Sequence, residues 1–85
     1  MRTYVRNYKR QKIGYVDIET SGKMTVHDAS GNKLGKIKPE RNCLVAYDRF
    51  NNKLGKWKEN EDCTYDASGR KICKANVLIG LYFNP

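Results

Sequence analysis

Short apolar stretches alternate with clusters of turn-forming residues along the chain, and the same order of residues recurs four times. Each copy has strand-forming residues, then an Asp or Asn, and after the turn a Lys followed by an aliphatic residue. The residues that open the four turns are Asn7, Asp28, Asp48 and Asp66. Because an Asp or Asn side chain can bind backbone amides two residues further on and fix a tight reversal, this order predicts four β-hairpins.

Two further positions of the repeat have a conformational reason. Gly31, Asn51 and Gly69 end their turns, where a positive φ is expected and Gly or Asn tolerates it. A glycine follows the aliphatic residue in three copies, namely Gly14, Gly35 and Gly55, and Cys73 replaces it in the fourth. The aliphatic residue and the one three positions later would face opposite sides of a regular strand, so we expect a bulge here and interpret the glycine as the bend that lets each hairpin curl.

The repeat therefore predicts an all-β fold with at least seven strands and no helix longer than about two turns. We expect one domain, residues 1–85, in which four degenerate tandem hairpins form a ring- or fan-like antiparallel array. The expected copies span about residues 4–22, 23–42, 43–61 and 62–76. The densest apolar run, residues 77–83, predicts an extra C-terminal strand that pairs with the N-terminal strand and closes the array.

The order Tyr-Asp-x-x-Gly-x-x-aliphatic-Gly resembles the short tandem repeats of the bacterial β-flower proteins, in which hairpins are arranged like petals round an axis. The resemblance covers about residues 4–75 and is best at residues 27–35, 47–55 and 65–72. The chain departs from it at Asn7 and Arg10 in the first copy and at Cys73 in the fourth. The resemblance implies the petal-like architecture and carries over no activity, ligand or functional residue.

Cysteine and histidine are too few for several kinds of site. The chain has three cysteines, Cys43, Cys63 and Cys73, and one histidine, His27, with no C-x-x-C motif, so we expect no zinc or other metal site. An odd cysteine count without a secretion signal favours a reducing, cytoplasmic location with free buried thiols. A disulfide between Cys63 and Cys73, which flank one turn, remains the alternative.

No known catalytic arrangement or cofactor motif is present, so we expect no enzyme and no cofactor. His27 occupies the repeat position of Tyr47 and Tyr65, which favours a structural role, and the turn carboxylates recur for conformational reasons. No stretch of 18 apolar residues occurs, so we expect no membrane span.

Positive charge is the strongest functional indication. Seventeen Lys and Arg against nine Asp and Glu give a net charge of +8, which favours an anionic partner. Lysines recur at two repeat positions, and these anion-binding candidates are Lys12, Lys33, Lys53 and Lys71 at the first and Lys36, Lys56 and Lys74 at the second. The other reading is that Lys is the default exposed strand residue of a duplicated unit. Tyr15 and Trp57 lie near these lysines and would stack on bases if exposed or belong to the core if buried.

The sequence thus predicts a non-catalytic basic module that binds nucleic acid, a nucleotide or another phosphorylated small molecule. The alternative is a small bacterial or phage protein-interaction or inhibitor module that docks on an acidic protein surface. Both hypotheses use the same positive charge, and neither fixes an oligomeric state.

Overall fold

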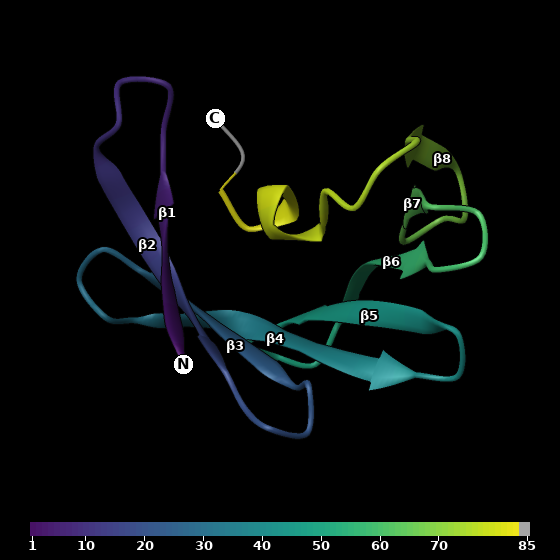
Figure 1. The fold of residues 1–85 in the computed structure, drawn as a ribbon, viewed down its shortest axis with the longest axis horizontal. Helices are drawn as coiled ribbons and strands as arrows, with labels where there is room; N and C mark the ends of the chain where they lie inside the picture. Colours follow the sequence, from purple (N-terminus) through teal and green to yellow (C-terminus); the bar gives the residue numbers. More distant parts are fainter. Residues whose placement is uncertain (84–85) are drawn as a thin grey trace.

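A computed structural model describes residues 1–83 and confirms the all-β prediction. It contains eight strands and one short 3-10 helix: β1 (Arg2–Arg6), β2 (Lys12–Ile18), β3 (Met24–Asp28), β4 (Lys33–Glu40), β5 (Cys43–Asp48), β6 (Lys53–Lys58), β7 (Cys63–Asp66), β8 (Lys71–Cys73) and η1 (Leu78–Leu81). The strands form one antiparallel sheet in which each strand pairs with its neighbours in the sequence, from β1 to β8 (Figure 1).

The tips of the hairpins β1–β2, β3–β4, β5–β6 and β7–β8 share one set of hydrogen bonds. In the second, the Oδ1 atom of Asp28 accepts the backbone amides of Ser30 and Asn32, both at 2.9 Å. Asn7, Asp48 and Asp66 accept the corresponding pairs of amides in their own turns. The bonds from Asn32 hold the pKa of the Asp28 carboxyl below its ordinary value. The predicted role of these residues in the turns is confirmed.

Each tip ends on a residue in the left-handed region. The φ values are 90° at Gly31, 68° at Asn51 and 94° at Gly69, as the sequence predicts, and 63° at Arg10. This conformation costs a residue with a Cβ atom about 1–2 kcal/mol, and only Gly and, to a lesser degree, Asn adopt it readily. The first tip therefore carries strain that the other three avoid.

Arg10→Gly should raise the unfolding free energy by about 0.5–1 kcal/mol, since relief of the left-handed strain exceeds the extra chain entropy of glycine. Thermal unfolding followed by circular dichroism should show a melting temperature several degrees higher. The control is Lys9→Gly, in the same turn but without positive φ. This control should lower the melting temperature, and a rise of equal size in both variants would contradict the explanation.

A bulge lies at the same place in every hairpin. The register shifts between Val26 and His27 in β3, for example, so that Val26 pairs with Gly35, His27 pairs with Lys33, and Leu34 is left without a partner. The residues bulged in this way are Ile13, Leu34, Leu54 and Ile72. The expected bulge is thus present, on the aliphatic residue that precedes the glycine position. Bulges increase the local twist of a strand pair, and the sheet is strongly curled (Figure 1).

The C-terminal strand predicted for residues 77–83 is wrong. These residues, which we call the C-terminal segment, contain η1 and lie in the hollow of the curled sheet, between the first hairpin and β6–β8 (Figure 1). Within residues 1–83, β1 and β8 do not pair, so the sheet is open and no strand closes it. Leu78 is 1% exposed and belongs to the core cluster with Val16, Val26, Ile37 and Ala46.

The C-terminal segment packs against the glycines of the repeat. A Cβ atom added to Gly14 would lie 2.4 Å from Cζ of Phe83, and one on Gly35 would lie 2.6 Å from Cε1 of Tyr82. At Gly55 the nearest atom of the segment is Cδ1 of Leu81, at 3.0 Å. Each of these glycines thus accommodates one of three consecutive side chains of the segment.

The helical turn explains why a strand does not form here. Alternate side chains of a strand point to opposite faces, whereas a turn with three residues per repeat spreads consecutive side chains in different directions. Leu78 can therefore enter the core while Leu81, Tyr82 and Phe83 reach separate hairpins. We correct our interpretation of the glycines accordingly: they are needed for close approach, both of this segment and of the neighbouring strand.

All three cysteines are free. Cys63 is buried as expected, but Cys43 is only partly buried and Cys73 is exposed. Cys73 pairs with Thr64, the neighbour of Cys63, so the side chains of Cys63 and Cys73 point to opposite faces of the sheet. This geometry explains why the alternative disulfide does not form.

Candidate anion-binding surface

The register places the repeated lysines that lie within strands on the face of the sheet that points away from the C-terminal segment. Ile37 and Ala46 face the core and pair with each other, so their neighbours Lys36 and Tyr47, which also pair, face outward. We call the outward side of β4–β8 the basic face. Its members are Lys33, Lys36, Lys38, Lys53, Lys56, Lys58, Lys71, Tyr47 and Tyr65.

The lysines of the first predicted set have equivalent positions. Lys12, Lys33, Lys53 and Lys71 each begin the second strand of a hairpin and are exposed. Their pairing partners are, in order, Arg6, His27, Tyr47 and Tyr65. The structure brings Lys33, Lys53 and Lys71 onto the basic face. Lys12 lies on the first hairpin, with its Nζ 4.2 Å from the ring centroid of Tyr4.

The second set is less uniform. Lys36 and Lys56 lie within β4 and β6 and are partly buried, whereas Lys74 follows the end of β8 and is exposed. Sequence reasoning missed Lys38 and Lys58, which belong to the same surface. Each lies two residues after a member of the set, and the alternation of side chains along a strand could have identified both.

The ammonium groups are close enough to influence one another. Partial burial, followed by the charge of Lys38 and then those of Lys23 and Lys33, lowers the pKa of Lys36. On the other side of the surface the nearby charges of Lys58, Lys71 and Lys56 help to lower the pKa of Glu61, although the hydrogen bond from Tyr65 contributes most. The basic face therefore carries mutually repelling charge that an anion would relieve.

Two carboxylates lie beside these lysines, and each accepts a hydrogen bond from a tyrosine. The hydroxyl of Tyr47 donates to Oε2 of Glu40 at 3.0 Å, and that of Tyr65 donates to Oε1 of Glu61. The latter bond is the main cause that raises the pKa of Tyr65 to about 12. The tyrosines are thereby fixed in position and occupy the acidic groups that could otherwise pair with lysine.

The rings of the same tyrosines lie under cations. Nζ of Lys38 is 5.7 Å from the ring centroid of Tyr47, and Nζ of Lys58 is 4.9 Å from that of Tyr65. Such contacts contribute about 0.5–1 kcal/mol at exposed sites. They hold each ammonium group over one face of its tyrosine ring, where it would compete with a stacked base.

The two predicted stacking residues already have partners. Tyr15 stacks on His27 with ring centroids 4.6 Å apart, and the guanidinium of Arg2 lies 4.1 Å from its centroid. Trp57 packs against the core, and its indole nitrogen donates to Asp62 at 2.9 Å. A role of either ring in binding stays a prediction.

One shallow hollow opens at the end of the basic face. It has a volume of about 310 Å³ and is lined by Arg41, Asn42, Cys43, Lys56, Lys58, Asn60 and Glu61. In residues 1–83 no group of three or more His, Cys, Asp or Glu side chains is arranged to hold a metal ion. Nor does this part of the chain contain a helix long and apolar enough to cross a membrane.

Comparisons with protein-family models, with curated proteins and with solved structures each return no match. The resemblance to β-flower proteins therefore stays a prediction from the repeat, and the case for a function depends on the surface itself.

Proposed function

We propose that the protein is a non-catalytic module that binds nucleic acid through contacts between its basic face and the phosphate backbone. The observation that carries the proposal is a row of three lysines, which the strand register places on alternate strands of the basic face. Lys38 pairs with Val45, which pairs with Lys56, which in turn pairs with Tyr65, the partner of Lys71. The strand register thus aligns lysines from three different repeat positions in one row across the surface.

The spacing of this row favours an extended polyanion over a small phosphorylated molecule. Lysines on strands two apart in the sheet are separated by roughly 10 Å, and those two residues apart on one strand by roughly 7 Å. Both distances are comparable with or below the screening length of about 8–10 Å near physiological salt, so a long anion can interact with several lysines together. A small ligand would contact only one or two of them.

Phosphate contacts position a nucleic acid without reading its sequence. Because a lysine ammonium group already lies over one face of each tyrosine ring on the basic face, we expect base stacking to add little. We therefore expect weak sequence preference and a strong dependence of affinity on salt concentration.

The double substitution Lys38→Gln with Lys56→Gln should weaken binding of a fluorescently labelled oligonucleotide measured by anisotropy. The slope of log affinity against log salt concentration is negative, and its magnitude should decrease by roughly 1.4–1.8, because two fewer phosphates are neutralised. The matched control is Lys9→Gln with Arg49→Gln, which removes the same charge from exposed hairpin tips.

The control should change the slope much less than the test variant. Equal loss in both would show that only net charge matters and would contradict a defined surface. If the unmodified protein binds no oligonucleotide even at low salt, the proposal is wrong and docking on an acidic protein surface replaces it. Competition by a nucleotide at equal phosphate concentration would instead identify a small phosphorylated ligand.

A further inference from the structure

The outer edge of β1 carries backbone groups that have no partner within residues 1–83. The amino group of Met1 donates to the carbonyl of Ile18 at 3.0 Å, and the amide of Ile18 donates back at 2.7 Å. In an antiparallel pair such two-way bonds recur at every second residue. The backbone groups of Thr3 and Val5 therefore also point toward β2, and those of Arg2, Tyr4 and Arg6 point outward along the free edge.

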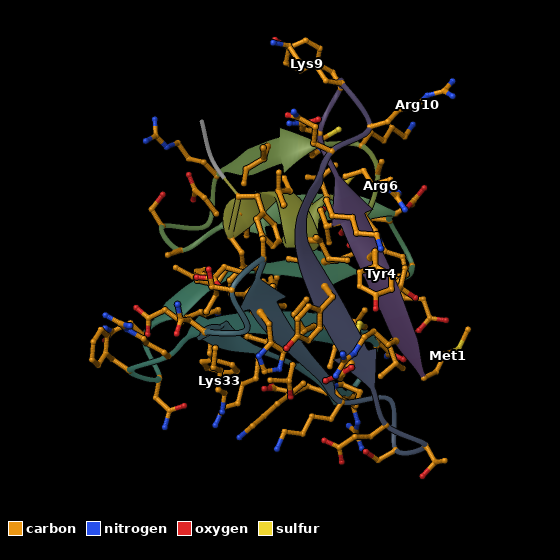
Figure 2. All side chains as sticks on the ribbon, turned by 90° about the vertical axis from the view of Figure 1, so that its left-hand side faces the viewer. Met1, Tyr4, Arg6, Lys9, Arg10 and Lys33 are labelled. Carbon is orange, nitrogen blue, oxygen red and sulfur yellow. The ribbon has the colours of Figure 1, made fainter. Side chains whose placement is uncertain are left out.

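This edge is positively charged. Arg2, Tyr4 and Arg6 direct their side chains to one face, because they alternate along β1. Lys9 and Arg10 lie at the tip of the same hairpin (Figure 2). Arg2 pairs with Asp17 at 2.8 Å, whereas among residues 1–83 the guanidinium of Arg6 donates only to the carbonyl of Arg10. A segment placed alongside β1 would gain most from acidic residues opposite these side chains.

A hollow lies beside β1 on the face opposite to the side chains of Arg2, Tyr4 and Arg6. Its volume is about 580 Å³, and its mostly apolar lining includes Val5, Ile13, Ile79 and Phe83, with Tyr8 and Arg6 at the strand end. A residue in an added strand opposite Val5 would have its Cβ atom about 5 Å from that of Val5. An apolar side chain there can enter the hollow.

Pairing with a second copy of the protein fits this edge poorly. A two-fold antiparallel pair centred on Tyr4 would place Arg2 of one copy directly opposite Arg6 of the other, on the same face. Like charges directly opposite each other destabilise a strand pair. The charge of the edge thus disfavours self-association and favours an acidic partner.

We propose that the free edge of β1 binds an extended acidic segment of another protein as an additional antiparallel strand. The outward backbone groups of Arg2, Tyr4 and Arg6 supply the hydrogen bonds. Acidic residues of the segment face Arg2 and Arg6, and an alternating apolar residue enters the hollow beside Val5. Main-chain bonds give such a complex its affinity, and the alternating side chains give it specificity.

The probe is a synthetic peptide in which Glu and Val alternate, and its control is a peptide of the same composition with Glu and Val in separate blocks. We expect the alternating peptide to bind and to slow amide hydrogen exchange at Tyr4 and Arg6 in the full chain. Exchange at Thr3 and Val5, whose amides already donate to β2, should change far less. Equal affinity for both peptides, or no slowing at Tyr4 and Arg6, would overturn the proposal.

Substitutions at Tyr4 separate the backbone from the side chain. Tyr4→Pro removes an outward amide without removing a bond to β2, and it should lower peptide affinity at least tenfold. Tyr4→Ala keeps the amide and should bind within a few-fold of the unmodified protein. If the proline variant fails to fold, the exchange measurement on the unmodified protein decides.

Charge substitutions distinguish this edge from the basic face. Arg6→Glu should abolish peptide binding, whereas Arg49→Glu, with the same change in net charge, should reduce it only slightly. Lys38→Gln with Lys56→Gln should leave peptide affinity unchanged while weakening the oligonucleotide complex. If the peptide follows the oligonucleotide in all variants, it binds as a polyanion on the basic face and the edge proposal is wrong.

Discussion

Replacing Gly35 with alanine should lower the unfolding free energy by at least about 3 kcal/mol. This loss equals or exceeds the largest usual cost of adding a carbon atom to a packed core. A Cβ atom at this position would lie 2.1 Å from the carbonyl oxygen of Tyr47 and 2.6 Å from the ring of Tyr82. The first contact is with backbone, so a change of rotamer cannot relieve it. The hydroxyl of Tyr82, which lies 2.9 Å from the carbonyl oxygen of Lys36 and 2.8 Å from that of Tyr47, would also be displaced.

Other glycines provide graded controls for the same substitution. Gly80→Ala adds a Cβ atom with no neighbour within 4 Å and no positive φ, so stability should stay the same or rise slightly. Gly69 also has open space but a φ of 94°, and its replacement by alanine should cost about 1 kcal/mol of backbone strain. Urea unfolding of the three variants should rank them with Gly35→Ala lowest, and a loss at Gly35 no larger than at Gly69 would contradict the packing explanation.

The second large effect concerns the C-terminal segment. Ending the chain at Asn76 should abolish cooperative unfolding, because it uncovers the core residues Val16, Val26 and Ile37 and removes Leu78, which is 1% exposed. Each fully buried aliphatic side chain contributes roughly 1.5–3 kcal/mol, and a domain has only about 5–15 kcal/mol in total. Near-ultraviolet circular dichroism should show loss of fixed tertiary packing.

Leu78→Ala tests the same contact without truncation. The expected cost is about 2–5 kcal/mol, since the segment is held in the hollow and cannot move far to fill the space. Ile72→Ala is the matched control, because Ile72 is 46% exposed and its loss should change stability by less than about 0.5 kcal/mol. A cooperative transition of the shortened chain at the original melting temperature would refute this account of the segment.

The parts of the fold that local sequence determines were predictable. The turn at Asp28 depends on amides two and four residues away, and the bulge at Leu34 lies within the pairing of β3 with β4. Since these interactions lie within one hairpin, a recurring pattern of residue types was enough to locate them. The same holds for Lys33 and Lys53, whose equivalent places on the sheet follow from the repeat.

The parts that depend on distant contacts were not predictable. The apolar run at residues 77–83 is too short for its periodicity to separate strand from helix. Tyr82 contacts the carbonyl of Lys36, a residue 46 positions away, and no feature of the repeat predicts that contact. For the same reason the sequence could not show which face of the sheet Trp57 occupies. The free edge of β1 was not recognised, because we expected a closing strand to pair with it.

The order of contacts along the chain has a consequence for folding kinetics. Every strand pair joins neighbours in the sequence, so hairpins can form independently on a microsecond timescale. The C-terminal segment contacts three of the hairpins and is synthesised after all of them. The core can therefore exclude water only in a late step, after the sheet has curled. Substitutions in this segment should then change mainly the unfolding rate, whereas substitutions in the turns should change the folding rate.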